Sequence, residues 1–330
     1  MTTIQMKDVL PEWTPAAAIG HRNLTLVPLR GEGHRQRFQD YLLADEAINA
    51  GVLTVTEVDE SGTVPELLAV NDSERPVLLI DGEELQGAKQ DRILNTSVFL
   101  PPKSKTRIPV SCVEAGRWSH VSRTFKSGHC APSSLRQRKS RDVQHSLRTR
   151  GRPESDQGAV WDSVAEHTDA CAAPSPTQAM SDAMEGLSDV LGRYHGALPY
   201  PSDACGVVAA VCGRFIAADA FDSPSTLEAI WPRLVASYAM DAEAARTQPP
   251  KTFTAKAAEV LLEHVADQQC QAFNAAGLGE DLRFEADDVL GQALRVENHL
   301  LHISVFPSPI DRQNIPDPGP RITPPSRRRR

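Results

Sequence analysis

The chain has 330 residues and an ordinary globular composition, with 40% hydrophobic residues, 24% charged residues and a net charge of −8 at pH 7. These values exclude a fibrous repeat and general disorder, and the length allows one large domain or two closely associated ones. No apolar run approaches the roughly 18 to 20 residues that a membrane span requires, and residues 1–20 lack the continuous apolar stretch of a signal peptide.

The cysteines indicate the redox environment. The six of them form no C-x-x-C pair, which is typical of free thiols and argues against a structural zinc site (Cys112, Cys130, Cys171, Cys205, Cys212, Cys270). We therefore expect a cytoplasmic protein with no metal site and no contact with a membrane.

Strand patterns dominate the N-terminal part of the chain. After a leader over residues 1–21, a strand over 22–31 and a short helix over 35–51 are predicted, with Gly51 as the helix cap. Residues 52–58 and 63–70 predict a β-hairpin, and residues 77–80 are apolar enough for a strand buried on both faces. Residues 93–100 and 106–113 continue the pattern, so that 22–122 is mostly β.

A basic segment separates the two halves. Residues 123–152 contain nine lysines and arginines and one acid, and we expect residues 123–157 to be a surface excursion outside the core. Such a segment in an acidic chain predicts either a site for phosphate groups, as in RNA, or for an acidic protein partner. The alternative is a solvated loop that pairs with the acidic surface around it.

Helices and two β-hairpins are predicted in the C-terminal part. Helical patterns cover residues 157–171, 175–194, 222–240 and 254–277, the third with a capping-box spacing from Ser225 to Glu228. One hairpin turns at Cys212–Gly213 and the other at Glu297–Asn298. Residues 307–330, with seven prolines and a final run of four arginines, predict an unpacked tail. The predicted fold class is α+β, a single domain over 22–306 whose N-terminal half is strand-rich and whose C-terminal half is helix-rich.

The first candidate motif is "DGEELQGAKQDR", residues 81–92, directly after a buried strand. Gly82 and Gly87 allow tight turns, so we expect the polar side chains to project from a loop. Carboxylates there could accept sugar hydroxyls, hold a divalent cation or serve as acid and base, and Lys89 and Arg92 could bind phosphate. The alternative is a polar hairpin whose charges satisfy one another.

The second motif is "SCVEAGRW", residues 111–118. Trp118 offers a face for stacking, or it is a core tryptophan with Glu114 and Arg117 paired at its rim. Cys112 and Arg117 have the spacing of a rhodanese loop, but the bulk of Val113 and the charge of Glu114 oppose a reactive thiolate.

Both motifs resemble a known family. They and residues 41–58, 108–118, 157–161 and 206–224 are similar to the bacterial ARG and rhodanese-phosphatase-superfamily-associated proteins, a family of unknown function, over about residues 22 to 306. The resemblance implies work around NAD, ADP-ribose or RNA-repair chemistry, through association with ADP-ribosylglycohydrolases and rhodanese-like phosphatases. Asp91 departs from the asparagine of the family pattern.

We therefore expect the two motifs to line one pocket, open to solvent, that binds or hydrolyses a phosphate-bearing sugar or nucleotide such as an ADP-ribose derivative. Lys89, Arg92 and Arg117 would bind phosphate, Gln90 would contact the ligand, and Trp118 would stack on it. Glu83 and Glu114 would accept ribose hydroxyls or act as acid and base. One alternative is a non-enzymatic RNA- or protein-interaction module that uses residues 123–152. The other is a rhodanese-like enzyme that uses Cys112.

Overall fold

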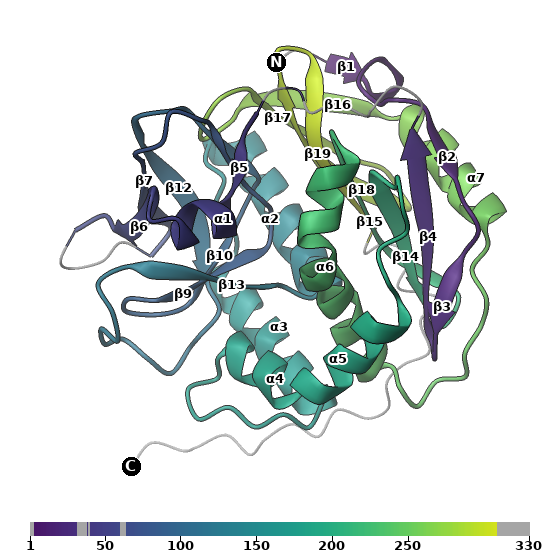
Figure 1. Cartoon of the computed structure of the whole chain (residues 1–330), viewed down its shortest axis with the longest axis horizontal. Helices are drawn as coiled ribbons and strands as arrows, with labels where there is room; N and C mark the ends of the chain where they lie inside the picture. Colours follow the sequence, from purple (N-terminus) through teal and green to yellow (C-terminus); the bar gives the residue numbers. More distant parts are fainter. Residues whose placement is uncertain (1–2, 32–37, 39, 60–63, 309–330) are drawn as a thin grey trace.

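The computed structural model describes residues 3–31, 38, 40–59 and 64–308 (Figure 1). Helices and strands are mixed, the N-terminal half is rich in strands, and the helices lie mostly in the C-terminal half, so the α+β prediction is confirmed. Within the described ranges, no helix is both long and apolar enough to span a membrane.

The largest layer is a ten-stranded, antiparallel sheet. Its order is β1-β16-β17-β18-β19-β15-β14-β4-β2, with β3 also paired to β4. The strands are β1 (Thr3–Gln5), β2 (Trp13–Pro15), β3 (Ile19–His21), β4 (Leu24–Gly31), β14 (Gly206–Val211), β15 (Arg214–Phe221), β16 (Gln269–Asn274), β17 (Glu280–Glu285), β18 (Val289–Val296) and β19 (His299–Pro307).

Both C-terminal hairpins were predicted correctly, as β14–β15 and β18–β19. Their turns contain the expected residues in the left-handed region, with φ of 51° at Cys212 and 67° at Asn298. The leader prediction was wrong, because residues 3–21 contribute strands β1, β2 and β3 to the sheet. These strands are only three residues long, which is too short for a clear alternation of apolar and polar residues.

A second sheet is strongly curled. Its order is β13-β9-β10-β12-β7-β6, and its two edge strands, β6 and β13, contact each other. The strands are β6 (Leu53–Glu57), β7 (Glu66–Asn71), β9 (Glu83–Gly87), β10 (Arg92–Leu94), β12 (Ser104–Cys112) and β13 (Phe125–Cys130). Its interior holds an apolar cluster that includes Val55, Leu85, Leu94 and Val110. The β6–β7 hairpin was predicted, although residues 60–63 of its turn lie outside the described residues.

A three-stranded sheet joins the two larger ones. It consists of β5 (Leu42–Leu43), β8 (Val77–Leu79) and β11 (Val98–Leu100), with β5 parallel to β8. Leu78 belongs to the core shared with the large sheet, whereas Val77 and Leu79 belong to the core of the curled sheet. Strand β8 is therefore buried on both faces, as predicted. Residues 93–100 form two strands, not one, because the chain leaves the curled sheet after Leu94 and enters the small sheet at Val98.

Seven helices complete the described part of the chain, and Figure 1 shows α6 in front of the large sheet. They are α1 (Ala44–Asn49), α2 (Ser133–Arg150), α3 (Gln157–Ala170), α4 (Met180–Gly186), α5 (Ser188–Ala197), α6 (Pro224–Ala244) and α7 (Ala255–Ala266). Helix α6 packs on β4, β14 and β15, and α7 packs beside β2. Helix α1 is shorter than predicted, and residues 32–37 and 39 of that prediction lie outside the described residues.

Helix ends differ from the sequence predictions in three places. The long helix predicted over 254–277 stops at Ala266, and Gln269–Asn274 is strand β16, because this segment pairs with β1 and β17. A Cβ on Gly277 would lie 2.3 Å from the Phe99 carbonyl oxygen, so this glycine permits close packing and does not cap a helix. The 175–194 pattern is split into α4 and α5, and α6 is capped by Ser223, two residues before the predicted Ser225.

The basic segment is the largest error of the sequence predictions. Residues 125–150 are not a surface excursion, because they form β13, paired with β9, and α2, which contacts β15, β18 and β19. Arg136 and Lys139 have no exposed surface at all. Arg136 is 2.5 Å from Asp219 of the large sheet, and it and Lys139 both pair with Asp81 at the start of the first motif. Helix α2 therefore lies between the two sheets as an ionic core element.

Most of the remaining cations of the basic segment also have acidic partners. Arg138 pairs with Glu166, Arg148 with Glu285, and both Arg150 and Arg152 with Glu154. A groove of about 880 Å³ is lined by four arginines and three acids (Arg138, Arg141, Arg148, Arg150, Asp142, Asp156 and Glu285). The positive charge of the groove is thus largely balanced by acids, which argues against a surface that binds the phosphates of a nucleic acid. Residues 309–330, where the unpacked tail was predicted, lie outside the described residues.

Candidate functional site

The first motif is buried and does not form an open loop. Every residue from Asp81 to Arg92 is buried, and the motif supplies strand β9, the turn after it and the first residue of β10. Gly87 has a φ of 126°, which lets β9 end in a tight turn. The two motifs are adjacent in space, as predicted, because Arg92 of β10 is directly opposite Cys112 of β12. The pocket open to solvent that we expected between them is closed in this structure.

Three polar residues lie at one end of the curled sheet, which we call the mouth. Strand β6 ends at Glu57, β12 ends at Cys112, and β10 begins at Arg92. Because strand side chains alternate, Arg92 faces the same side as Leu94 and Glu57 the same side as Val55, both of which belong to the interior cluster. Arg92 and Glu57 therefore point into the curled sheet at its mouth.

Arg92 has an incomplete set of hydrogen bonds. Its side chain has no exposed surface, and Nη1 donates to the Gln90 side-chain oxygen over 3.1 Å. Nε and Nη2 have no hydrogen-bond acceptor among the described residues. The nearest carboxylate oxygen is Oε1 of Glu57, 3.6 Å from Nη2, which is beyond the usual length of a charge-assisted hydrogen bond. Buried guanidinium nitrogens without acceptors are uncommon, since their desolvation is costly.

Trp118 covers this arginine. The centre of its indole ring is 5.7 Å from the Arg92 guanidinium carbon and 5.5 Å from Lys89 Nζ, within the range of cation–π attraction. Half of the Trp118 side chain is exposed, whereas Lys89 and Arg92 are buried. The sequence left two possibilities for Trp118, a core tryptophan beside a Glu114–Arg117 pair or an open face for stacking. The structure shows neither. Trp118 is a surface cover over two cations.

Arg117, by contrast, has its acceptors already. Its Nη2 lies 2.5 Å from Glu114 and 3.1 Å from Asp91, and its Nη1 donates to the Ala88 carbonyl oxygen. Gln90 donates to the Glu114 backbone oxygen over 2.8 Å. Burial would raise the pKa of Glu114, but hydrogen bonds from Arg117 and from the Asp91 N–H hold it below its ordinary value. Here the charges satisfy one another, and Glu114 is held as a carboxylate.

Glu83 does not join this group. It begins β9, two residues before Leu85, the residue directly opposite Arg92, and on the side away from the turn that carries Lys89. Glu83 pairs instead with Arg233 of α6 and accepts a hydrogen bond from the Ile80 N–H over 3.2 Å. Its grouping with Lys89, Arg92 and Trp118 was therefore wrong.

Glu84 is a buried carboxyl group that sequence reasoning did not single out. One oxygen accepts from the Gln86 amide and from the His129 N–H, and the other has no partner among the described residues. Burial, together with the nearby charge of Asp91, raises its pKa to about 8. It lies opposite Ile93 and so faces away from the interior that Arg92 faces. In the sequence, the only signal for Glu84 is its position in a run of acidic residues.

The Cys112 alternative loses its chemical basis. The thiol has no exposed surface, and burial raises its pKa to about 11. In the fully described stretch after Arg117, no helix begins before β13, so this loop does not lead into a helix as a rhodanese loop does. Among the described residues there is also no group of three or more His, Cys, Asp or Glu side chains that could hold a metal ion.

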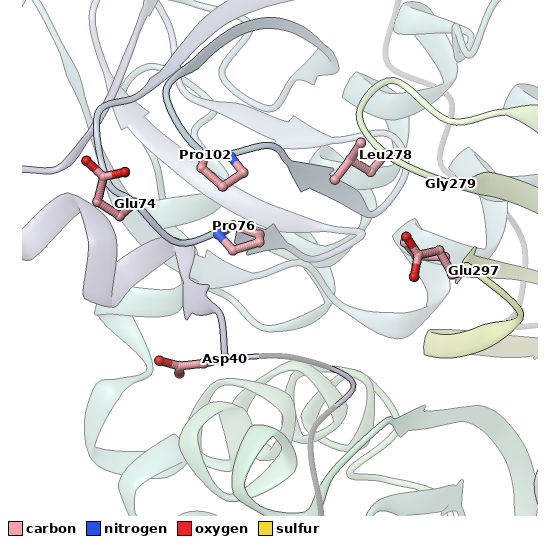
Figure 2. A pocket seen from close by; sticks show the side chains of 8 residues that line it. Asp40, Glu74, Pro76, Pro102, Leu278, Gly279 and Glu297 are labelled. Carbon is pink, nitrogen blue, oxygen red and sulfur yellow. The ribbon is translucent and has the colours of Figure 1, made fainter.

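Two sizeable hollows of the molecule lie away from both motifs. Figure 2 shows one of about 510 Å³ at the tips of several turns, with Glu74 beside Pro76 and Pro102 and with Glu297 across from them. Two of its carboxylates are already paired, Asp40 with Arg75 and Glu74 with Lys103. A larger and more apolar groove of about 810 Å³ runs between α7, the β14–β15 hairpin and the end of α6. None of the residues predicted for the site lines either hollow.

The chain is an α+β protein whose curled sheet ends in a charged mouth covered by Trp118. The family model of the ARG and Rhodanese-Phosphatase-superfamily-associated Protein domain matches residues 14–306. The chain therefore belongs to this family, as the two motifs indicated. No curated protein and no solved structure matches the chain.

Proposed function

We propose that the mouth binds a small ligand through its phosphate group, with Arg92 and Lys89 as the phosphate-binding residues and Trp118 as the cover that the ligand displaces or stacks against. The observation that carries this proposal is the buried Arg92 guanidinium, two of whose nitrogens have no acceptor among the described residues. A phosphate offers oxygens in the geometry that a guanidinium binds with two parallel hydrogen bonds.

The surroundings support an anion more than a cation. Lys89 and Arg92 both lie under the Trp118 ring, and Arg117 nearby balances Glu114 and Asp91. An aromatic ring beside cations also suits a nucleotide or sugar phosphate, whose base or sugar ring can stack while the phosphate is held. A nucleotide such as ADP-ribose is thus the first ligand to test.

Binding is better supported than hydrolysis. General acid–base catalysis needs one carboxyl group that can give up a proton beside one that can accept it. Glu114 has a lowered pKa, and Glu84, whose pKa is about 8, faces away from the sheet interior. Glu83, the first residue of β9, pairs with Arg233 of α6. The mouth therefore lacks an assembled pair, and we propose ligand binding as the function.

Calorimetry with ADP-ribose tests the proposal. We expect binding to the wild-type protein and a loss of about tenfold or more in Arg92→Gln and in Lys89→Gln, because a hydrogen bond to a charged group contributes about 1.5–3 kcal/mol. Arg107→Gln and Lys105→Gln are matched controls, since both residues are exposed on β12 of the same sheet. They should bind as the wild type does.

Tryptophan fluorescence locates the ligand. The protein has four tryptophans, and only Trp118 lies over Lys89 and Arg92, so saturation with ADP-ribose should change the emission of the wild type and much less that of Trp118→Phe. No heat and no emission change with ADP-ribose or with inorganic pyrophosphate would refute the proposed function. Equal weakening by the matched controls would move the site elsewhere.

A further inference from the structure

Glu57, the last residue of β6, has no place in either motif, yet it lies in the mouth. Its side chain is 6% exposed, and neither carboxylate oxygen has a hydrogen-bond donor among the described residues. Its closest cation is Arg92, at 3.6 Å. The mouth thus contains a carboxylate without donors directly beside two guanidinium nitrogens, Nε and Nη2 of Arg92, without acceptors.

The energetics of burial make this arrangement unusual. The 3.6 Å separation keeps the Coulomb attraction between the two ions but is about 0.7–0.9 Å longer than a charge-assisted hydrogen bond. A buried carboxylate that keeps an ion-pair partner but no hydrogen bond has lost its water without full compensation. A ligand that brings donors to Glu57 and acceptors to Arg92 would supply what both groups lack.

We propose that Glu57 is a ligand-binding residue and that the ligand carries a pair of neighbouring hydroxyl groups next to its phosphate, as a ribose phosphate does. This inference rests on the proposed function. Each carboxylate oxygen accepts a hydrogen bond from one hydroxyl group, while the phosphate binds Arg92.

Simpler ligands would supply hydrogen-bond partners to only one of the two groups, Arg92 or Glu57. A free phosphate ion gives Arg92 its acceptors but brings no donor to Glu57, whose charge repels it. A neutral diol gives Glu57 its donors but leaves Arg92 without acceptors. A phosphate that carries an ammonium group would serve both, but Lys89 and Arg92, side by side under Trp118, repel a further cation. The combination of phosphate and diol fits all four charged and aromatic side chains.

The test compares ligands that differ by one group. Calorimetry measures the binding of ribose 5-phosphate, 2-deoxyribose 5-phosphate, inorganic phosphate and phosphoethanolamine to the wild-type protein. We expect ribose 5-phosphate to bind about tenfold more tightly than its deoxy analogue, because one hydrogen bond to a charged group is lost. Inorganic phosphate and phosphoethanolamine should bind more weakly than ribose 5-phosphate.

Variants of Glu57 then assign the selectivity. In Glu57→Gln the preference for the ribose compound should fall below about threefold, since an amide offers one acceptor oxygen in place of two, while inorganic phosphate should bind at least as well as before. Glu66→Gln is the matched control, because Glu66 is on the neighbouring strand β7, partly exposed and paired with Arg107, and it should keep the preference.

The outcomes separate this inference from the proposed function. If none of the phosphates binds the wild type, both fail together. If they bind with equal affinity, or if phosphoethanolamine binds most tightly, the phosphate site stands and the diol assignment is overturned. A purely structural Glu57 predicts a lower melting temperature for Glu57→Gln with the ligand preference unchanged. If Glu57→Gln does not fold, the comparison of ligands on the wild type still tests the diol assignment. Glu57→Asp, whose shorter side chain cannot reach the hydroxyl groups, tests the role of Glu57.

Discussion

At the scale of single residues, Glu84 is the carboxyl group with the clearest effect of its surroundings on its proton. Burial raises its pKa from an ordinary value of 4.5 to about 8. In this interval the folded protein keeps a proton that the unfolded chain has released, so the free energy of unfolding falls as pH rises from about 4.5 to about 8. Below this window both states are protonated, and the effect is absent.

Substituting Glu84 by glutamine should remove this pH dependence. We expect Glu84→Gln to be more stable than the wild type at pH 8 by a few kcal/mol, since each pH unit in the window costs about 1.4 kcal/mol, and close to the wild type at pH 5. Urea unfolding at both pH values measures the difference. Glu154→Gln serves as a control with no such trend, because Glu154 is partly exposed between α2 and α3 and pairs with Arg150. A constant difference between the two pH values would contradict the raised pKa.

The same scale shows what the motifs could and could not predict about the site. Lys89, Arg92 and Trp118 were grouped correctly in space because residue types and two adjacent strands suffice for that. Glu83 was misplaced because the motif was interpreted as a compact loop, whereas its first half is strand β9 and the Glu83 carboxylate pairs with Arg233 of α6. Glu57 was not predicted as a site residue because it belongs to neither motif and follows an apolar run in the sequence. Only the curling of the sheet brings it close to Arg92.

At the scale of elements, α2 is an unusual helix because it is buried through charge. Arg136 donates to Asp219 over 2.5 and 3.0 Å and to Ser304 over 2.8 Å. Burial would raise the pKa of Asp219, but Arg136 and His302 hold it well below its ordinary value. Patterning cannot detect such a helix, since its buried face includes Arg136, Lys139 and Gln144, residues that are normally assigned to the surface.

Removal of one buried partner on α2 should therefore be costly. We expect Arg136→Met to lower the free energy of unfolding by about 3–5 kcal/mol, because the buried Asp219 carboxylate loses its guanidinium partner and keeps only Tyr238, Ser304 and His302. Arg138→Met, two residues along the same helix and paired with Glu166 only at 3.9 Å, should cost about 1 kcal/mol or less. Denaturant unfolding of both variants measures this. Similar losses in the two would show that α2 is not anchored through Arg136.

At the scale of the whole molecule, the layers were harder to predict than the strands within them. Both C-terminal hairpins and the β6–β7 hairpin follow from turn residues and local alternation. The assignment of strands to three sheets does not, because it depends on pairings such as β4 with β14, which join residues far apart in the chain. Likewise, residues 269–274 have a helical pattern locally but become a strand because β1 and β17 flank them.

The same long-range contacts make the sheets depend on one another. Leu78 and Phe99 of the small sheet pack in the core of α6 and the large sheet, while their neighbours pack in the curled sheet. Arg136 pairs with Asp81 on one side and with Asp219 on the other. We therefore expect the curled sheet and the large sheet to open together in a single cooperative transition.

Native-state hydrogen exchange can test this coupling. Peptides covering β9–β10 and β14–β15 should exchange through openings of equal free energy in the wild type, because neither sheet can open without exposing the shared core. In Arg136→Met the two should separate, with β9–β10 exchanging first, since the curled sheet then loses its ionic link to Asp219 while the large sheet keeps the packing of α6 and α7. Exchange of β9–β10 at a clearly lower free energy than β14–β15 in the wild type would mean that the curled sheet unfolds independently. Ligand binding at the mouth would then slow exchange in the curled sheet alone.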